Sequence, residues 1–204
     1  MREYLERSMT FADYISLVDR LLAEGKTTGP IQNEAKVDFT KLNRYRIDRL
    51  EKTIVLGDAI KAAAQGLTRK MTWLIITEGW CGDAAQNVPA IEKIAAASDN
   101  ITTRYILRDE NLELMDRYLT DGARSIPKLI AIDDESGDVL GTWGSRPLAA
   151  QLAFEDMKAR GIDKDTILEQ MQRWYNSDRS VAVQKEFEDL IKQWGEGRSV
   201  AARG

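Results

Sequence analysis

Residues 78–89 read EGWCGDAAQNVP and hold the only cysteine of this 204-residue chain, Cys81. The run TWLIIT at 72–77 comes before them without polar alternation, which is typical of a central strand buried on both faces. A helical pattern follows over 82–98, with Pro89 in its interior. Because a proline inside a helix costs about 3 kcal/mol, its presence there indicates a specific structural requirement. The stretch predicts a strand, a turn and a helix, with the cysteine at the helix start.

The rest of the chain predicts an α/β layered architecture around this unit. Beyond it, the order strand, helix, strand, strand, helix places a parallel pair of strands beside an antiparallel hairpin. Before it we expect three helices, the first behind a Thr10 cap and the second with Phe39, Leu42, Ile47 and Leu50 on its apolar side. The other expected segments are strands at 101–107, 127–132 and 139–143, and helices at 57–65, 111–119 and 147–160.

Composition excludes several classes of function. With 29 basic and 33 acidic residues, the net charge of −4 predicts no global attraction to nucleic acid or anionic lipid. With no histidine and one cysteine, the chain lacks the residues for an intramolecular disulfide and for the usual zinc, Ser-His-Asp and Cys-His sites, so no metal site is expected. The apolar runs are far shorter than the roughly 20 residues of a membrane span, and the first residues lack an apolar signal region. We therefore expect a cytoplasmic protein with neither a membrane nor a nucleic acid as partner.

The basic residues of the second expected helix are interpreted as a solvated face. Only Tyr45 supplies an aromatic side chain among them, which is too little for a nucleic-acid surface. These residues are Lys41, Arg44, Arg46, Arg49 and Lys52.

Several features in register resemble the thioredoxin superfamily. WCG at 80–82 resembles the start of that family's Trp-Cys-Gly-Pro-Cys motif, and Pro89 falls where thioredoxins carry a proline in the active-site helix. Pro127, 46 positions after the cysteine, resembles the family's cis-proline, and Gly144 matches a further glycine of the pattern. The resemblance implies a thioredoxin-like fold, a central mixed sheet flanked by helices, and a cis Ile126-Pro127 bond that faces the cysteine.

The resemblance covers about half of the chain. We expect one thioredoxin-like domain over 1–204, because the apolar faces of 10–24 and 163–194 should dock on the core. The tail after Trp194 is expected to fray. In chain order the parts are a helical N-terminal extension over 1–66, the thioredoxin-fold core over 67–160 and a helical C-terminal extension over 161–204.

The motif departs from the family at the position of the second sulfur. Cys81-Gly82-Asp83-Ala84 puts an alanine where most relatives carry the resolving cysteine. Ile75 stands where thioredoxins carry a buried acid that transfers protons. Dithiol reductase activity is therefore not expected. The residues assigned to the site are Cys81 as the catalytic group, Trp80, Gly82, Asp83 and Ala84 as the rest of the motif, and Ile126 and Pro127 as the substrate-binding edge.

The reactivity of Cys81 depends on the pKa of its thiol, because the thiolate is the nucleophile. Backbone N–H groups at the helix start, including that of Ala84, favour the thiolate, while the charges of Asp83 and Glu78 oppose it. We expect a modestly lowered pKa and a partly exposed sulfur. Asp83 is either a helix-start acid that interacts with the helix dipole or a chemical group. Glu78 and the Arg108-Asp109 pair are expected to be solvated charges near the same rim.

Two functions from different classes fit these residues. In the first, the protein is a monothiol thiol-disulfide oxidoreductase: Cys81 attacks a protein or small-molecule disulfide, and an external thiol such as glutathione resolves the mixed disulfide. In the second, it is a redox-inactive thioredoxin-fold binding or chaperone-like module. An iron–sulfur carrier like the monothiol glutaredoxins is disfavoured, because Asp83-Ala84 does not match their Phe-Ser. No cofactor is expected other than glutathione as co-substrate, and the client, the reductant and the oligomeric state do not follow from the sequence.

Overall fold

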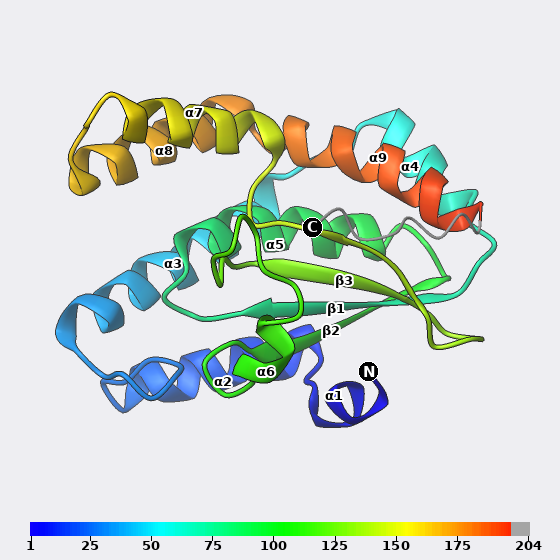
Figure 1. Ribbon diagram of the computed structural model, residues 1–204, viewed down its shortest axis with the longest axis horizontal. Coiled ribbons are helices and arrows are strands. Elements are labelled where there is room, and N and C mark those ends of the chain that lie inside the picture. Colours follow the sequence, from blue (N-terminus) through cyan, green and yellow to red (C-terminus); the bar gives the residue numbers. More distant parts are fainter. Residues whose placement is uncertain (197–204) are drawn as a thin grey trace.

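A four-stranded sheet lies at the centre of the molecule in the computed structural model, which describes residues 1–196 (Figure 1). Its strands are β1 (Met71–Thr77), β2 (Ile101–Leu107), β3 (Lys128–Asp133) and β4 (Val139–Trp143). The order across the sheet is β2-β1-β3-β4, in which β1 and β2 are parallel and the other neighbours antiparallel. This confirms the expected parallel pair beside an antiparallel hairpin.

Strand β1 is the buried centre of the sheet, as its continuous apolar run predicts. All of its residues except Thr72 are buried, and Ile75 lies between Tyr105 of β2 and Leu129 of β3. An apolar residue therefore occupies the place of the family's buried acid, and the strand can point apolar side chains to both faces because helices cover it.

Nine helices surround the sheet in the described part of the chain. In the view of Figure 1, α5 lies directly above the sheet, α4, α7, α8 and α9 lie above α5, and α1 and α2 lie below, beside β2. The helices are α1 (Arg2–Arg7), α2 (Phe11–Ala23), α3 (Glu34–Thr53), α4 (Asp58–Gln65), α5 (Gly82–Ala95), α6 (Leu112–Met115), α7 (Leu148–Ala159), α8 (Lys164–Asp178) and α9 (Val181–Gly195).

The expected helices are present, with two differences. Helix α1 was not expected, and α6 is a single turn within the segment predicted as a helix over 111–119. Elsewhere the local signals hold: Thr10 caps α2 with a reciprocal bond to Asp13, and Pro89 lies inside α5.

The buried side of α3 differs from the prediction. Ile47 and Leu50 are buried as expected, but Phe39 and Leu42 are each 44% exposed. Thr40 and Asn43 are buried in their place, and the Asn43 side chain donates to the backbone oxygen of Gly79. Polar contacts therefore set the rotation of this helix, which leaves Phe39 at the surface.

Helices α2 and α9 dock on the sheet, as expected for 10–24 and for the end of 163–194, whereas α8 packs with α7 in a separate cluster. Tyr14 of α2 belongs to the main core, and its ring stacks on Tyr105 of β2. On the opposite side, Phe187 and Trp194 of α9 contact Trp73 of β1, with ring centroids 5.1 and 6.1 Å apart. The tail after Trp194 was expected to fray, but most of it, residues 197–204, lies outside the described residues.

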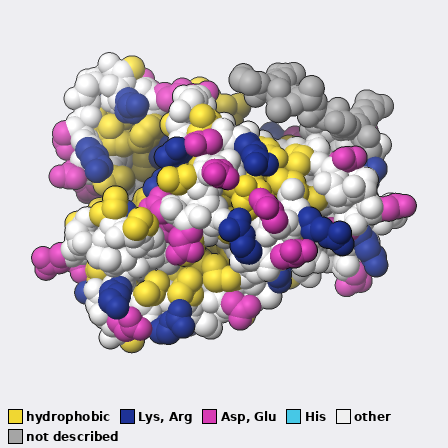
Figure 2. Space-filling view, turned by 60° about the horizontal axis from the view of Figure 1, so that its bottom comes forward, with side chains coloured by type: hydrophobic (Ala, Val, Ile, Leu, Met, Phe, Trp, Pro, Cys, Tyr) yellow, Lys and Arg dark blue, Asp and Glu magenta, His cyan; other side chains and the backbone are white. Residues whose placement is uncertain are grey.

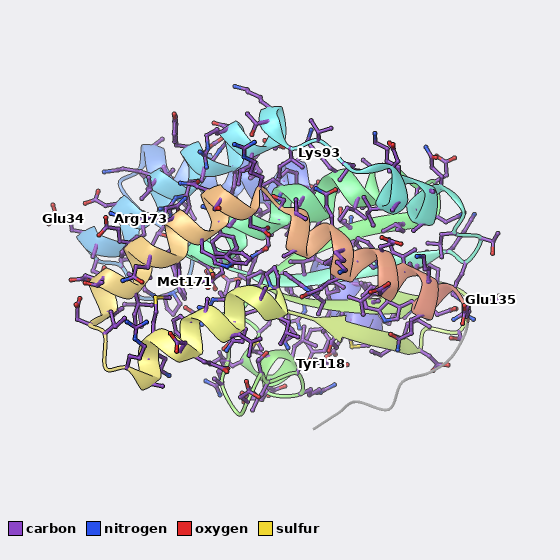
Figure 3. The ribbon with its side chains drawn as sticks, turned by 90° about the horizontal axis from the view of Figure 1, so that it is seen from above. Glu34, Lys93, Tyr118, Glu135, Met171 and Arg173 are labelled. Atoms are coloured by element: carbon purple, nitrogen blue, oxygen red, sulfur yellow. The ribbon has the colours of Figure 1, made fainter. Side chains whose placement is uncertain are left out.

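Helices α7 and α8 form a hairpin with an apolar cluster of its own. Figure 3 shows Met171 of α8 on the side that faces α7. This cluster is separate from the main core, so the α7–α8 hairpin is a second packing unit on the sheet domain. Its buried members are Ala150, Met157, Ile167, Met171 and Tyr175. Within residues 1–196, no helix combines the length and the apolarity that a membrane span requires.

Candidate functional site: Cys81 and the adjoining cavity

Cys81 is the N-cap residue of α5, in the turn that follows β1. Its Sγ accepts a hydrogen bond from the Ala84 N–H at 3.4 Å and donates one to the Ile126 carbonyl oxygen at 3.2 Å. The Ile126-Pro127 peptide bond is cis, as the resemblance implies. The fold therefore brings together three of the residues assigned to the site, from two segments 45 positions apart.

The sulfur is buried and its thiol is a weak acid, which corrects two expectations. Cys81 is 8% exposed rather than partly exposed. Burial, and then the charge of Asp83, raise the pKa of the Cys81 thiol to about 12, although the amides of Ala84 and Asp83 act in the opposite direction. The predicted modest lowering of the pKa was wrong, because the cost of desolvating the thiolate exceeds the stabilisation that it gains from two amide hydrogen bonds.

Gly144 closes the floor of the site against the cis-proline segment. Its φ of +120° is in the region that favours glycine, and a Cβ atom there would lie 2.1 Å from the backbone oxygen of Pro127. No side chain fits this gap. The hairpin therefore presses directly on the backbone beside Ile126, and Ile126 and Pro127 are both buried.

Glu78 is a buried structural carboxylate and not a solvated rim charge, which corrects that expectation. It is 0% exposed, and it accepts hydrogen bonds from the Thr28 hydroxyl and from the Asp109 N–H, the latter at 2.8 Å. Burial raises its pKa above the usual range. Arg108 and Asp109 are largely buried as well and form an ion pair of 2.7 Å. Glu78 thus joins the loop before α3 to the loop after β2.

Asp83 has two partners from distant segments that the sequence did not indicate. Its carboxylate forms an ion pair of 2.7 Å with Arg146 and accepts a hydrogen bond of 2.8 Å from the Tyr175 hydroxyl. The same hydroxyl accepts from the Asn87 side chain at 3.1 Å. Tyr175 lies 92 positions from Asp83, and no motif or spacing could have found it. Asp83 therefore ties the first turn of α5 to α8, beyond its place at the helix dipole.

A cavity of about 390 Å³ opens beside Cys81, between α3, the start of α5 and the α7–α8 hairpin. Cys81, Gly82 and Asp83 form one wall. Figure 2 shows a hollow with hydrophobic side chains and nearby basic groups on the left, at the end of the molecule where α7, α8 and the start of α3 lie. Its apolar lining includes Phe39, Trp80, Phe154, Leu168 and Met171.

Basic side chains border this cavity on several sides. Lys36 Nζ lies 4.2 Å from the centroid of the Trp80 ring, and the Arg146 guanidinium lies 4.1 Å from that of Phe154. Arg46, which was interpreted as part of a solvated face, is half-buried in the wall instead, and a Cβ atom on Gly82 would lie 3.8 Å from its Nη1. Burial and the neighbouring charge of Arg49 lower its pKa. Lys164 completes the set.

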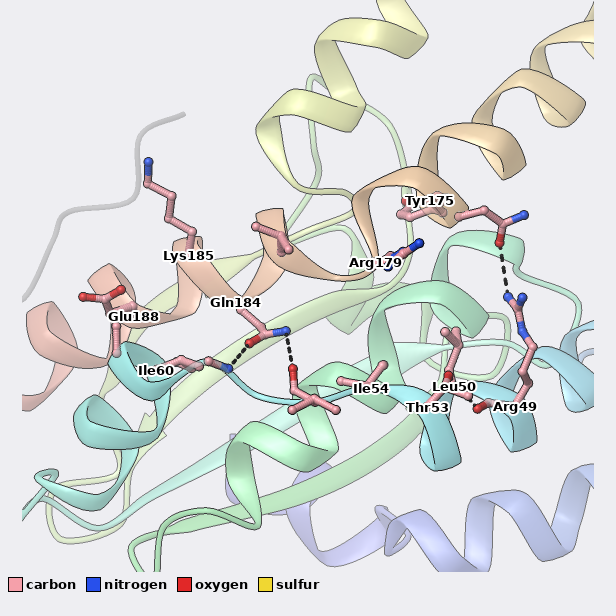
Figure 4. A pocket seen from close by; sticks show the side chains of 15 residues that line it. Arg49, Leu50, Thr53, Ile54, Ile60, Tyr175, Arg179, Gln184, Lys185 and Glu188 are labelled. Atoms are coloured by element: carbon pink, nitrogen blue, oxygen red, sulfur yellow. Dashed lines mark hydrogen bonds between the residues drawn. The ribbon is translucent and has the colours of Figure 1, made fainter.

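A second cavity, of about 790 Å³, lies between the end of α3 and the junction of α8 with α9. Figure 4 shows that its polar side chains bond to one another: Arg49 donates to Asn176 at 3.2 Å, and Gln184 bridges the backbone of Gly57 and Val55. Tyr175 lines both cavities, so α8 separates them. Because Arg49, Asn176 and Gln184 already bond within the chain and no residue of the cysteine motif lines it, this cavity makes the weaker case for a ligand.

No group of three or more His, Cys, Asp or Glu side chains that could hold a metal ion occurs among residues 1–196. Space for an organic ligand or a cofactor is found instead in the cavity beside Cys81.

The sequence matches a family model described as thioredoxin over residues 29–158, which is more than half of the chain. Among curated proteins, none matches it significantly. A solved protein of unknown function from Pseudomonas aeruginosa is 16% identical, with a TM-score of 0.58 over 90% of this chain and 98% of its own. A scaffold for an HIV epitope is 17% identical, with a TM-score of 0.56 and the same coverage of both chains. At these identities, the two structures show a shared fold.

Proposed function

We propose that this chain, which belongs to the thioredoxin family, binds a small molecule in the cavity beside Cys81 and keeps the thiol protonated. The observation that carries the proposal is that a buried, fully hydrogen-bonded thiol borders an open cavity. The sulfur is buried, with one hydrogen bond donated and one accepted. The cavity that it borders has a volume within the usual range for small-molecule sites.

The residues around Cys81 support binding without turnover. Ala84 removes the second sulfur, and Ile75 removes the buried acid of the family. Burial raises the pKa of the thiol to about 12, so at neutral pH the thiol is almost entirely protonated. The fold and the first cysteine are retained, while the second sulfur and the buried acid are replaced by apolar residues.

A neutral fluorescent probe, N-phenyl-1-naphthylamine, tests this function directly. We expect saturable one-to-one binding to the wild type and at least about tenfold weaker binding to Leu168→Trp, because the larger ring fills the cavity. Leu152→Trp is the matched control: Leu152 is 57% exposed on α7 and does not line the cavity, against 43% for Leu168. Equal binding to both variants, or no saturable binding to the wild type, contradicts the proposal.

Monothiol exchange is the second candidate, and a specific observation favours it. Cys81 lines the cavity, and its sulfur already accepts the Ala84 N–H that would stabilise a thiolate. The thiolate would attack a protein or small-molecule disulfide, forming a new S–S bond while the other sulfur leaves as a thiolate. An external thiol such as glutathione would then break that bond, regenerate Cys81 and leave as a new disulfide. Ile126 and Pro127 would hold the substrate, with no other cofactor.

The pH dependence of the reaction of Cys81 with 4,4′-dithiodipyridine separates the two candidates. If the protein binds a ligand and keeps the thiol protonated, the rate rises about tenfold per pH unit without a plateau below about pH 10. At pH 7 the rate is then about 10² times slower than that of free cysteine, because the smaller thiolate fraction is offset in part by the greater nucleophilicity of a more basic thiolate. If the protein is a monothiol oxidoreductase, the rate reaches a plateau near neutral pH. Intact mass then shows one glutathione added by glutathione disulfide and removed again by reduced glutathione. Cys81→Ser is the blank in both experiments.

A further inference from the structure

We infer that the ligand of the cavity beside Cys81 is an amphipathic anion, a small molecule with a flat apolar body and one carboxylate, sulfonate or phosphate group. This inference rests on the proposed binding function and names its ligand class. The reasons are the balance of charge on the wall, the position of the charges and the nature of the surface between them.

The wall carries an excess of three positive charges. Lys36, Arg46, Arg146 and Lys164 line the cavity, and Asp83 is its one acidic group among the described residues. The Asp83 carboxylate already has the Arg146 guanidinium and the Tyr175 hydroxyl as partners. No carboxylate lies within 4.0 Å of the cationic group of Lys36, Arg46 or Lys164 in residues 1–196. A neutral ligand would leave these three cations without a counter-charge.

The wall is also short of hydrogen-bond acceptors. Trp80 Nε1 and Arg146 Nε are buried donors with no acceptor in the described part of the chain. Arg46 has only the side-chain oxygen of Asn43, at 2.9 Å, although it is half-buried. Buried donors without acceptors are costly, and a guanidinium out of water gains more from an anion than from a neutral oxygen.

The cations stand around an apolar surface. Phe39 from α3 and Leu168 from α8 are both partly exposed large apolar side chains at this cavity, and Phe154 and Met171 continue the surface inward. Solvated cations alone would suit an inorganic ion, but this lining favours a ligand with an apolar body. The two requirements together describe an aromatic or aliphatic acid.

Two of the cations offer substitutions that should leave the fold intact. Lys36 is the third residue of α3 and Lys164 the first of α8. Acidic residues are favourable in the first turn of a helix, so Lys36→Glu and Lys164→Glu reverse the charge of the cavity without weakening either helix. Lys41→Glu/Lys52→Glu, at two exposed positions of α3 outside the cavity, changes the net charge by the same amount and is the matched control.

The experiment compares two probes that differ by one sulfonate. 8-Anilino-1-naphthalenesulfonate is the anion, and N-phenyl-1-naphthylamine is its neutral counterpart. We expect the wild type to bind the anion more tightly, and the double variant Lys36→Glu/Lys164→Glu to bind it at least about tenfold more weakly, with the neutral probe unchanged. Added salt should weaken only the anion.

Each outcome separates this inference from the function on which it rests. If both probes bind, depend on Leu168 and ignore the two lysines, the cavity binds ligands but has no preference for anions, and the inference fails. If neither probe binds, the proposed function itself fails. If Lys41→Glu/Lys52→Glu weakens binding of the anion as much as Lys36→Glu/Lys164→Glu does, the effect is one of net charge, which also overturns the inference.

Discussion

The sheet and the α7–α8 hairpin both approach the start of α5, but they are held by different contacts. The sheet belongs to one continuous apolar core, in which Phe187 of α9 lies against Trp73 and Trp143. The hairpin has its own small cluster and meets α5 through polar pairs. These pairs include Asp83 with Tyr175, at 2.8 Å, and Gln86 with Gln172, also at 2.8 Å.

This difference determines how each region can respond to a ligand. Apolar contacts of the sheet are lost only when the whole domain unfolds, whereas a polar pair can be exchanged for water at a net cost of about 1 kcal/mol. The wall that α8 contributes is therefore the part of the cavity that can adjust, while the sheet core stays fixed. The following variants test the comparison, from the largest expected effect to the smallest.

Phe187→Ala should destabilise the whole domain. Phe187 is fully buried between three indole rings, so its loss should lower the free energy of unfolding by about 3–5 kcal/mol. Urea unfolding followed by fluorescence and by circular dichroism should shift together. Val181→Ala, at an exposed position of the same helix, should change the free energy by less than about 0.5 kcal/mol. A shift below about 1 kcal/mol for Phe187→Ala would place this ring outside the cooperative core.

Met171→Ala should destabilise the hairpin alone. Met171 is buried in the separate cluster, so a cost of about 2 kcal/mol is expected there. Hydrogen exchange should become faster in α7 and α8, while the amides of β1 keep their wild-type protection. Leu152→Ala, exposed on α7, is the control. Equal loss of protection in β1 would mean that the two regions unfold as one.

Asp83→Asn should loosen the link between α5 and α8 and activate the thiol. The variant leaves the largely buried Arg146 without its carboxylate, at a cost of about 1–2 kcal/mol. Because the charge of Asp83 raises the pKa of Cys81, its removal lowers that pKa, and alkylation should reach a given rate at a lower pH. Asp165→Asn, in the first turn of α8, should leave the alkylation profile unchanged. A profile unaffected by Asp83→Asn would show that burial alone sets the pKa.

Glu78→Gln should change the pH dependence of stability. Burial raises the pKa of Glu78, so between its unfolded and folded values the native state holds a proton that the unfolded state has released. The free energy of unfolding therefore falls as pH rises through this window, and the loss is complete above the folded value. The glutamine variant lacks this fall, so its stability relative to wild type should increase from about pH 4 upward in urea titrations. A constant difference between the two proteins across pH would contradict the raised pKa.

Local patterns predicted the elements but not every buried face. The apolar run of β1, the Thr10 cap and the position of Pro89 act within a few residues, and each was confirmed. The prediction failed for α3, where a count of apolar residues chose Phe39 and Leu42. Buried polar residues on that helix bond to segments before and after it in the chain, and no periodicity contains that information.

The environment of Cys81 was predicted least well. A resemblance can indicate that a cysteine begins a helix opposite a cis-proline, and both features are present. It cannot give the pKa of the thiol, because that depends on how closely Ile126 and its neighbours exclude water.

The sequence by itself determined what this site lacks. With one cysteine, an alanine at 84 and an isoleucine at 75, neither the second sulfur nor the proton-transferring acid of the family is present, whatever the fold. Only the tertiary structure decided what the site has. It pairs Asp83 with Arg146 and Tyr175, and it turns Lys36, Arg46 and Lys164 toward one apolar cavity. Chemical identity is a property of each residue alone, whereas burial and charge balance arise from segments that folding brings together across more than 90 positions.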